Sequence, residues 1–381
     1  MKVPLKTKEY VVFLFTDEYF EFDYGETHPF KINRLKLVYD LIKIYGLFDH
    51  PSLRIIKPYK ATEEEILTYH SSDYVKALKE ANKGEWDFKF TKYGLGPGDN
   101  PVFKGLWDFS LLVCGGSLLG AKMISKAEAK IVFNIAGGLH HAHPSCASGF
   151  CYLNDPVLAI KYLNEQGFKV AYVDIDAHHG DGVQEAFYET DKILTISLHQ
   201  DGRTLFPETG FIEEKGKGLG EGYSINVPLP PGTDDDIFKE AIDSIVIPAL
   251  NAFSPDVLVT QLGVDAFYND PLANLSLSTN GFTYAVEKLK DFSLPWLALG
   301  GGGYNIPNLA RAWTLALSIM LGLKLEDKLP QEGQILLSSY NYLSKNLRDT
   351  FIAPSPVKHR ILETVRREIK WLNDNCLSLI G

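Results

Sequence analysis

The stretch VAYVDIDAHHGDG, which spans Val170 to Gly182, joins an apolar run typical of a β-strand to a dense group of carboxylates and imidazoles. So many polar groups beside a buried strand are costly unless they are paired or bind an ion. Asp176 and His178 lie two residues apart, so an extended backbone points both side chains to the same side. An oxygen and an imidazole nitrogen together suit Zn²⁺, Fe²⁺ or Co²⁺ better than Ca²⁺ or Mg²⁺. The stretch therefore predicts a metal site at the tip of a strand.

Two more carboxylates belong to the same stretch. Asp174 lies on the face that carries the two candidate ligands, and Asp181 follows the turn. The simpler alternative is a polar strand end that caps a helix at Val183, and a single aspartate would fit it. The whole string favours the metal site.

The composition predicts a soluble protein with a large core. The chain has 381 residues, of which 45% are apolar, and its mean hydropathy is −0.07. No uncharged apolar run is long enough to span a membrane. The apolar stretch Tyr10–Phe15 is too short for a secretory signal, and no small-residue cleavage site follows it. We therefore expect a cytoplasmic protein with no membrane partner.

Cysteine usage and net charge indicate the cellular compartment and limit the possible binding partners. The four cysteines, Cys114, Cys146, Cys151 and Cys376, are scattered and form no CxxC pair, which indicates a reducing compartment and not a disulfide framework. Cys151 is expected to be a buried structural thiol. The 48 acidic and 38 basic residues give a net charge of −10. That charge disfavours direct binding to nucleic acid and is compatible with a cationic substrate.

Short β-rich runs alternate with segments of helical spacing along most of the chain. The runs that predict strands are Val11–Phe15, Ala129–Ile135, Val170–Ile175, Ile193–Leu198, Val257–Leu262 and Trp296–Leu299. The segments that predict helices are Asn33–Tyr45, Asp155–Gln166, Asp234–Phe253, Gly281–Lys290 and Ile306–Leu321. Apolar strands that are each followed by a helix require a mostly parallel central sheet covered by helices on both faces. We therefore expect an α/β fold with a single domain over residues 1–381.

The remaining segments predict loops and a C-terminal extension. The glycine-rich stretches Tyr93–Gly98 and Glu214–Gly222 are typical of surface loops. Residues 324–381 are expected to form a helical extension. Within it, Val357–Asn375 predicts a helix that packs on the domain or forms an oligomer contact. The sequence leaves the oligomeric state open.

Two adjacent histidines follow another predicted strand. In open α/β sheets, ligands bind beyond the carboxyl ends of the strands. Paired glycines allow a tight turn before His140 and His141, which point in different directions and so rarely share a metal. They can instead flank a substrate, each oriented by a carboxylate, and Asp174 and Asp181 are available for this role. Ordinary loop or core histidines are the alternative, which the glycines and the aspartates disfavour.

Two further strand ends carry candidate site residues. Val257–Leu262 leads to Asp265, our third metal ligand. Two aspartates and a histidine leave coordination positions open, as in catalytic metal sites, although Asp265 alone would fit a helix cap. The glycine run Gly300–Gly303 brings Tyr304 to the same edge, where its hydroxyl could donate to an oxyanion. A tyrosine in isolation would be interpreted as a packed aromatic.

In combination, these motifs resemble the zinc-dependent histone deacetylase family, which includes bacterial acetoin-utilisation deacetylases and shares an arginase-like fold. The resemblance extends from about His28 to Trp313. The matching blocks occur in the family's order and are His28–Arg34, Gly137–Ala142, Ser148–Asp155, Asp174–Gly182, Gln261–Asp265 and Gly300–Tyr304. Several independent motifs in one order are highly specific.

The resemblance assigns the metal ligands and the partners of the histidine pair. It makes Asp176, His178 and Asp265 the ligands of Zn²⁺, with Fe²⁺ as the other candidate metal. It also places Asp174 and Asp181 behind the two histidines. This agrees with the assignment made from the residues alone.

The implied reaction is hydrolysis of the N-acetyl amide of a lysine side chain on a protein or peptide, which releases acetate and the free amine. By resemblance, His141 is the general base that later protonates the amine. His140 is mainly an electrostatic partner, and Tyr304 donates a hydrogen bond to the tetrahedral oxyanion.

The resemblance also implies a narrow substrate tunnel. Phe150 and Phe206 would form its walls around the lysine stem, and Gly149 would leave space for that stem. Asp99 resembles the family's rim aspartate, which grips the substrate backbone. Leu272 occupies the position at which polyamine deacetylases carry an acidic residue, and an apolar side chain there favours peptides.

Members of the family also bind K⁺ beside the metal site. The first implied site comprises Asp174, Asp176, His178, Ser197 and Leu198. The second comprises Phe187, Thr190, Ile193 and Tyr223. His143–Cys146 departs from the family pattern, which could alter the rim, and His179 is expected to be structural.

Other functions remain open at this point. A small-molecule deacetylase acting on acetylpolyamines, or a deacylase of other acyl-lysines, would use the same motifs. A non-catalytic acyl-lysine binding module is disfavoured by the intact His140, His141 and Tyr304. A two-metal ureohydrolase would need additional ligands where this chain has histidines among glycines, so we expect one catalytic metal per chain.

Overall fold

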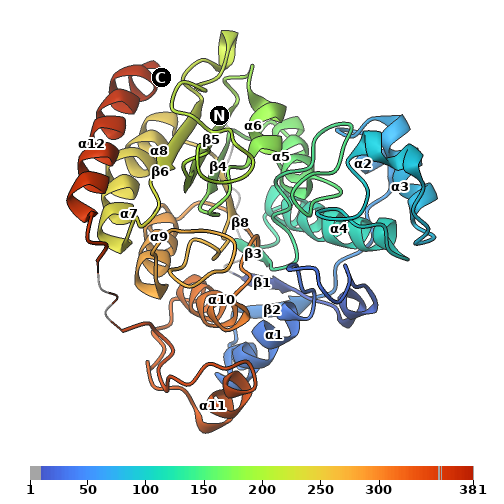
Figure 1. The fold of residues 1–381 in the computed structure, drawn as a ribbon, viewed down its shortest axis with the longest axis horizontal. Coiled ribbons are helices and arrows are strands. Elements are labelled where there is room, and N and C mark those ends of the chain that lie inside the picture. The colour runs from blue at the N-terminus through green and yellow to red at the C-terminus, as the bar shows by residue number, and fades with distance from the viewer. Residues whose placement is uncertain (1–9, 351, 353, 381) are drawn as a thin grey trace.

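A parallel sheet of eight strands forms the centre of the protein (Figure 1). The computed structural model describes residues 10–350, 352 and 354–380. The strand order is β2-β1-β3-β8-β7-β4-β5-β6, and every pair of neighbours is parallel. The strands are β1 Val11–Leu14, β2 Leu53–Ile56, β3 Ile131–Asn134, β4 Val170–Asp174, β5 Ile193–Gln200, β6 Ser224–Leu229, β7 Val257–Gln261 and β8 Trp296–Leu299. The predicted parallel α/β architecture is therefore confirmed.

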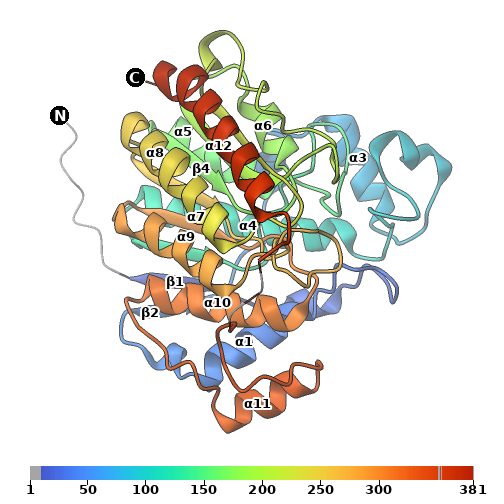
Figure 2. The same ribbon diagram turned by 60° about the vertical axis from the view of Figure 1, so that its left-hand side comes forward.

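Helices cover both faces of this sheet (Figures 1 and 2). The helices are α1 Arg34–Ile44, α2 Glu63–Ile66, α3 Ser72–Ala81, α4 Leu106–Ser125, α5 Asp155–Glu165, α6 Asp181–Phe187, α7 Asp235–Ala241, α8 Ile247–Phe253, α9 Thr279–Asp291, α10 Ile306–Met320, α11 Gln331–Ser338 and α12 Lys358–Asn375. Alternate strand residues face opposite layers, as the period of two requires. Val12 and Val132 pack in one layer with residues of α4 and α5, whereas Phe13 and Phe133 pack in the other with residues of α1 and α10.

The predicted helices are present, with one change of internal geometry. Asp234–Phe253 was expected to be one helix, and the structure contains α7, a π-helical segment Ile242–Val246 and α8 in direct succession. The sequence did not predict α4. Among the described residues α4 is the one helix long and apolar enough to cross a membrane, but 67% of its most apolar window is buried inside the fold. Burial of that kind is typical of a core helix.

The C-terminal residues add two helices to this core. Helix α11 lies beside α1, and α12 lies against β6 and α7 (Figure 2). Ile361, Val365 and Leu372 form the buried side of α12. The helix expected at Val357–Asn375 therefore packs on its own chain.

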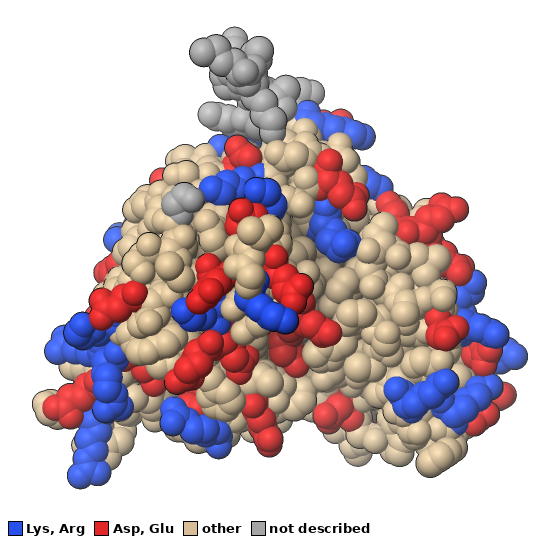
Figure 3. Space-filling view, turned by 90° about the horizontal axis from the view of Figure 1, so that it is seen from above, with Lys and Arg blue, Asp and Glu red and all other residues tan. Residues whose placement is uncertain are grey.

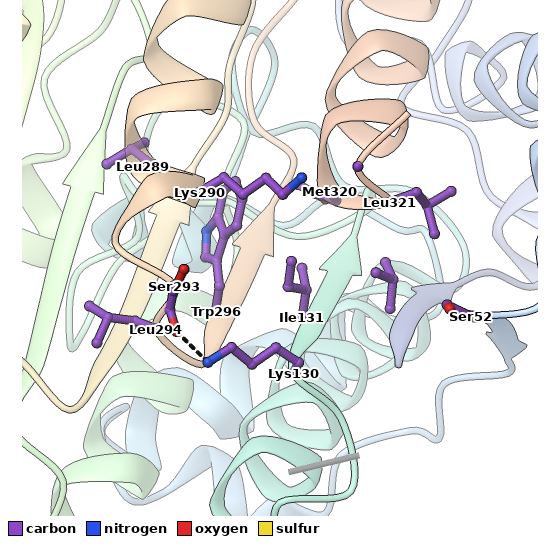
Figure 4. Close-up of a pocket in the computed structure, with 12 residues that line it drawn as sticks. Ser52, Lys130, Ile131, Leu289, Lys290, Ser293, Leu294, Trp296, Met320 and Leu321 are labelled. Carbon is purple, nitrogen blue, oxygen red and sulfur yellow. Dashed lines mark hydrogen bonds between the residues drawn. The ribbon is translucent and has the colours of Figure 1, made fainter. Parts of the chain in front are cut away.

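The two ends of the strands differ in character. The strand order places β3, β8, β7 and β4 side by side, so the polar residues that follow them meet at the carboxyl edge. At the amino ends of β1, β3 and β8 lies a cavity of about 300 Å³ lined by Ile131, Trp296 and Met320 (Figure 4). Lys130 closes one side by donating a hydrogen bond to the Ser293 carbonyl. The candidate catalytic residues lie at the opposite edge of the sheet, where the strands have their carboxyl ends.

The charged side chains are distributed without a single dominant sign on the face seen in Figure 3. Lysine and arginine residues there lie between aspartate and glutamate residues. The four cysteines are unpaired, and Cys151 is buried as expected. The unpaired cysteines fit the low cysteine content of the chain.

Candidate active site

Asp176, His178 and Asp265 converge at the carboxyl edge of the sheet. Asp176 and His178 follow β4, and Asp265 follows the neighbouring strand β7. One ligand atom from each residue lies within 4.8 Å of the others. The Nδ1 atom of His178 is 3.1 Å from Oδ1 of Asp176 and 2.9 Å from Oδ2 of Asp265. The three predicted metal ligands therefore point toward one place.

Backbone and amide groups fix the two carboxylates of this triad. Oδ2 of Asp176 accepts hydrogen bonds from the Gln261 side chain at 2.6 Å and from the Gly302 N–H at 2.7 Å. Oδ1 of Asp265 accepts one from the Ala177 N–H at 2.7 Å. The Cβ of an alanine at position 302 would lie 2.1 Å from Asp265 Oδ2, so glycine is required there. Such outer contacts orient metal ligands and hold their geometry.

The electrostatics of this triad favour a cation. Burial disfavours a charged imidazole, yet hydrogen bonds and charges from Asp176 and Asp265 raise the pKa of His178 to about 10. The carboxylates thus stabilise positive charge at the point where the three side chains meet. A divalent ion held by two oxygens and one nitrogen satisfies the same requirement, so the donor set fits Zn²⁺ or Fe²⁺.

The two adjacent histidines each have the carboxylate that the sequence predicted. His140 Nδ1 lies 2.7 Å from Asp174 Oδ2, and His141 Nδ1 lies 2.7 Å from Asp181 Oδ1. The two imidazole centroids are 4.0 Å apart, and all four side chains are largely buried. Each Nδ1 is thereby committed to its aspartate. The Nε2 atom of each ring is left for other partners.

The two imidazoles differ in their preference for a proton. Burial lowers the pKa of His140, but the Asp174 and Asp176 charges overcome this effect and raise it to about 9. Burial and the neighbouring His140 charge lower the pKa of His141 to about 4. His140 is therefore protonated at neutral pH and His141 is neutral. A neutral imidazole can accept a proton, and its charged neighbour can stabilise an anion.

A buried carboxylate holds the loop that carries this pair. Asp155, the first residue of α5, accepts hydrogen bonds from the backbone N–H groups of Gly138 and Leu139 at 2.8 to 3.1 Å. The side chain of Asn154 donates to the His140 carbonyl at 3.1 Å. The start of a helix thus fixes the backbone on which the two histidines are mounted.

A narrow pocket of about 220 Å³ leads to these groups. It brings together all five residues predicted to contact substrate, and it adds one that was not predicted, Leu205. Its lining comprises Asp99, His141, Gly149, Phe150, His178, Leu205, Phe206, Leu272 and Tyr304. The pocket therefore has an apolar wall, a polar end and a carboxylate at its side.

Local backbone geometry shapes this pocket. Gly149 and Phe150 both have positive φ, at 49° and 70°. An alanine Cβ at position 149 would lie 2.4 Å from the His141 ring, so glycine is required there. The Phe206 ring packs 5.0 Å from the His141 ring on the other side. The two phenylalanines and His141 thus enclose a slot suited to an unbranched alkyl chain.

Tyr304 lines the same pocket at the end of the glycine run. Its backbone N–H donates to Asp270 at 2.8 Å, and its ring lies 5.8 Å from that of Phe150. The buried Arg34 guanidinium donates to the carbonyls of Gly303 at 3.0 Å and Gly301 at 2.8 Å. The run that presents Tyr304 is therefore anchored at both ends.

Comparison with known proteins agrees with this geometry. The model of the histone deacetylase domain matches residues 28–320. The chain belongs to the histone deacetylase family. It is 37% identical over 372 residues to histone deacetylase 1 from Homo sapiens, covering 94% of this chain and 76% of that one. It is also 37% identical over 373 residues to histone deacetylase 19 from Arabidopsis thaliana, covering 96% of this chain and 72% of that one.

Solved structures of the family have the same fold. The crystal structure of an HDAC homolog complexed with SAHA has a TM-score of 0.86 and 36% identity, and covers 95% of this chain and 100% of its own. An HDAC homolog from Aquifex aeolicus has a TM-score of 0.83 and 35% identity, and covers 94% and 100%. The chain is therefore a histone deacetylase family hydrolase, and the family implies a metal cofactor.

His143, in the segment expected to depart from the family pattern, extends the histidine arrangement. His143 Nε2 lies 3.4 Å from Asp181 Oδ2, and His143 Nδ1 lies 2.5 Å from Glu185 Oε2. A hydrogen bond from the His143 ring to Asp181, opposed by burial and assisted by Glu185, raises the pKa of His143 to about 9. Sequence reasoning gave His143 no role, because its contact depends on how the following loop folds back.

The remaining predicted positions are divided between the site and the amino ends of β5 and β6. Asp174 and Ser197, two residues of the first implied K⁺ set, are paired in the β4–β5 register, next to Leu198. Phe187, Thr190, Ile193 and Tyr223, the residues of the second, border the α6–β5 connection and the start of β6. His179 is buried, and its ring nitrogens contact Thr209 at 2.8 Å and Gln184 at 3.3 Å.

Several residues that support this deacetylase-family site had no predicted role, among them Gln261, Arg34 and Leu205. Gln261 and Arg34 lie within motifs that resemble the family, and the structure gives them the contacts described above. Leu205 adjoins the predicted Phe206, and its place in the pocket follows from no pattern in the sequence. A buried amide next to a predicted metal ligand is a signal that could have identified Gln261.

Proposed function

We propose that this family member hydrolyses the N-acetyl amide of lysine side chains on proteins or peptides, with Zn²⁺ as its metal. The observation that carries the proposal is the pocket of about 220 Å³, because its apolar walls lead to His141, His178 and Tyr304 at one end. A lysine side chain is an unbranched alkyl stem with a polar group at its tip. The pocket matches both parts.

Different groups at the pocket activate the substrate and transfer the proton. When bound by Asp176, His178 and Asp265, zinc supplies Lewis acidity that polarises the amide carbonyl and lowers the pKa of the attacking water. His141, held through Nδ1 by Asp181, accepts the water proton and later donates it to the departing amine.

Two further groups stabilise charge as the carbonyl carbon becomes tetrahedral. Tyr304 donates a hydrogen bond from its hydroxyl group to the developing oxyanion. His140, protonated beside Asp174, supplies a fixed positive charge. Phe150 and Phe206 hold the lysine stem and exclude water from the reacting groups.

The proposal predicts large losses of activity at two positions. Tyr304→Phe and His141→Ala should each lower kcat on an acetyl-lysine peptide by roughly 10²-fold or more, because each removes a group that acts in the transition state. Tyr340→Phe, at an exposed tyrosine, is the matched control and should retain wild-type turnover. Near wild-type rates for either active-site variant would contradict the assigned roles.

Leu272 supports a peptide over a polyamine as the substrate. The residue lines the pocket and presents no charge to a second ammonium group. We therefore expect faster turnover of acetyl-lysine peptides than of acetylspermidine under the same conditions. A clear preference for the polyamine would replace the present proposal with the small-molecule one.

Three finer assignments accompany this proposal. The two sets of residues implied for K⁺ remain proposed cation sites, supported by the pairing of Asp174 with Ser197 in the sheet. Fe²⁺ is the alternative metal, since the same donors suit it. The unpaired cysteines support a cytoplasmic location.

A further inference from the structure

We propose that a groove beside the catalytic pocket binds the polypeptide around the acyl-lysine and selects an apolar side chain next to that lysine. The inference rests on the proposed function and specifies its substrate class. The groove has a volume of about 640 Å³, and its lining includes Trp86, Phe88, Leu95 and Pro97. We call it the side groove.

The side groove is continuous with the catalytic pocket. Asp99 and Gly149 line both of them. The Asp99 backbone is held in place, because its carbonyl accepts a hydrogen bond from His28 Nε2 at 3.2 Å. A polypeptide whose lysine side chain enters the pocket therefore passes Asp99 and continues along the side groove.

Two aromatic side chains in the side groove are unusually exposed. Phe88 is 77% exposed and Trp86 is 48% exposed. Exposed apolar surface of this kind marks binding sites, and aromatic residues are enriched in the centres of protein interfaces. Burial of these rings under an apolar side chain of the substrate removes that surface from water.

The side groove is preformed. Phe88 begins the 3₁₀ helix Phe88–Tyr93, whose start is capped by the Asp87 side chain. The Trp86 indole N–H donates to the Leu95 carbonyl at 3.4 Å. Gly94 ends the helix with positive φ, and its backbone approaches the Ala147 carbonyl so closely that a Cβ would lie 2.1 Å away. The rings therefore sit on a fixed frame, which reduces the entropy lost on binding.

The charges of the side groove exclude one class of flanking residue. Among the described residues that line it, Asp99 carries the only formal charge. An acidic side chain next to the lysine would meet this carboxylate without a compensating cation. The walls and the charge together favour leucine, methionine or an aromatic residue over aspartate or glutamate.

The experiment compares three substrates that share the same acetyl-lysine. Two are hexapeptides with either leucine or asparagine on each side of the modified lysine, and the third is acetyl-lysine with blocked termini and no flanking residue. We expect the wild-type enzyme to have a kcat/KM about tenfold higher for the leucine peptide than for the asparagine peptide. This preference should arise mainly in KM.

Substitution of residues in the side groove measures how much the groove contributes to the leucine preference. Phe88→Ala and Trp86→Ala should reduce the leucine preference to about twofold or less while they leave turnover of the blocked acetyl-lysine unchanged. Leu343→Ala, at a leucine that is 84% exposed outside the groove, is the matched control and should keep the full preference. The high exposure of Phe88 makes its replacement compatible with a normal fold, which the unfolding midpoint checks.

The outcomes separate this inference from the proposed function. A wild-type enzyme without a leucine preference, or one whose preference survives both groove substitutions, overturns the inference and leaves deacetylation intact. Self-association that Phe88→Ala abolishes would show that a second copy occupies the groove, which also overturns it. Failure to hydrolyse any of the three compounds would refute deacetylation itself, and the inference with it.

Discussion

At the residue scale, one aspartate connects the active site to the surface. Asp181 accepts a hydrogen bond from His141 at 2.7 Å and lies 3.4 Å from His143, which in turn contacts the exposed Glu185. The line of alternating acids and imidazoles keeps Asp181 ionised, and the two histidines hold its pKa well below the usual range despite burial. His141 thereby keeps a fixed orientation without carrying the charge itself.

This arrangement predicts a dependence of stability on pH. The folded pKa of His143, about 9, lies above the ordinary value of 6.5, so its ion pairs stabilise the fold fully below pH 6.5 and are lost as the pH rises through 9. We expect the free energy of unfolding to fall by about 1 kcal/mol over this interval, a value reduced for partial exposure. Chemical denaturation at several pH values measures it.

His143→Gln is the matched variant for this prediction. Glutamine retains hydrogen bonding but has no proton to lose, so its unfolding free energy should change less between pH 6.5 and 9. Equal pH dependence in both proteins would show that another group is responsible.

The convergence of the proposed ligands was predictable where the chain itself fixes their relative positions. Asp176 and His178 share one side of an extended segment, so their spacing alone indicated a metal site. Leu205 and His143 reach the site through loops, and the direction of a loop depends on contacts that are distant in sequence. For these residues only the folded chain shows the contact.

At the element scale, the turns after the strands determine how closely the ligands approach. Gly302 donates its N–H to Asp176, and it lies so near Asp265 that no Cβ fits. The carboxylates of two different strand ends are thus held by the turn after a third. This explains why the residue at position 302, in the glycine run after β8, is a glycine.

Gly302→Ala should disturb the metal site specifically. The added Cβ would lie 2.1 Å from Asp265 Oδ2, so this carboxylate must move and metal affinity should fall by about tenfold or more. Metal analysis after dialysis should give one ion per wild-type chain and less in the variant.

A glycine elsewhere provides the comparison for this substitution. Gly333→Ala on α11 meets its nearest neighbour at 3.5 Å, an ordinary contact, and should bind metal as the wild type does. A fully loaded Gly302→Ala protein would contradict the steric argument. Two tightly bound transition-metal ions in the wild type would contradict the assignment of a single catalytic metal.

Strands with a continuous apolar run were predicted, and the strands at the two edges of the sheet were not. The six predicted strands are buried along most of their length. Strand β2 exposes Arg54 and Ile55, and β6 contains Pro228 and Asn226, so neither shows a continuous apolar run. Edge strands pair on one side only, and this relaxes the sequence requirement.

At the scale of the whole molecule, α12 covers an edge of the sheet although it lies beyond the residues that match the family model. The helix packs on β6 and α7. Lys358 forms an ion pair with Asp234, the N-cap residue of α7. Arg366 forms another with Glu240 in α7. The expected C-terminal extension therefore shields a strand edge that would otherwise be free to pair with another chain.

Leu372→Ala tests the contribution of this helix. The side chain is fully buried, so its truncation should lower the free energy of unfolding by about 2 to 4 kcal/mol. Leu379→Ala, at a leucine that is 46% exposed, is the control and should cost much less. A loss for Leu372→Ala as small as that expected for the control, measured in denaturant titrations, would show that this packing adds little to stability.

The order of the strands has a consequence for synthesis of the protein. β7 and β8 are made late, yet they lie between β3 and β4 at the centre of the sheet. A growing chain that ends after β6 therefore has two separate groups of strands with open edges and no contact between β3 and β4. Such a chain lacks Asp265 and Tyr304, so the proposed active site is incomplete and the open strand edges favour aggregation. We infer that the enzyme remains inactive on the ribosome until β7 and β8 have been inserted between β3 and β4.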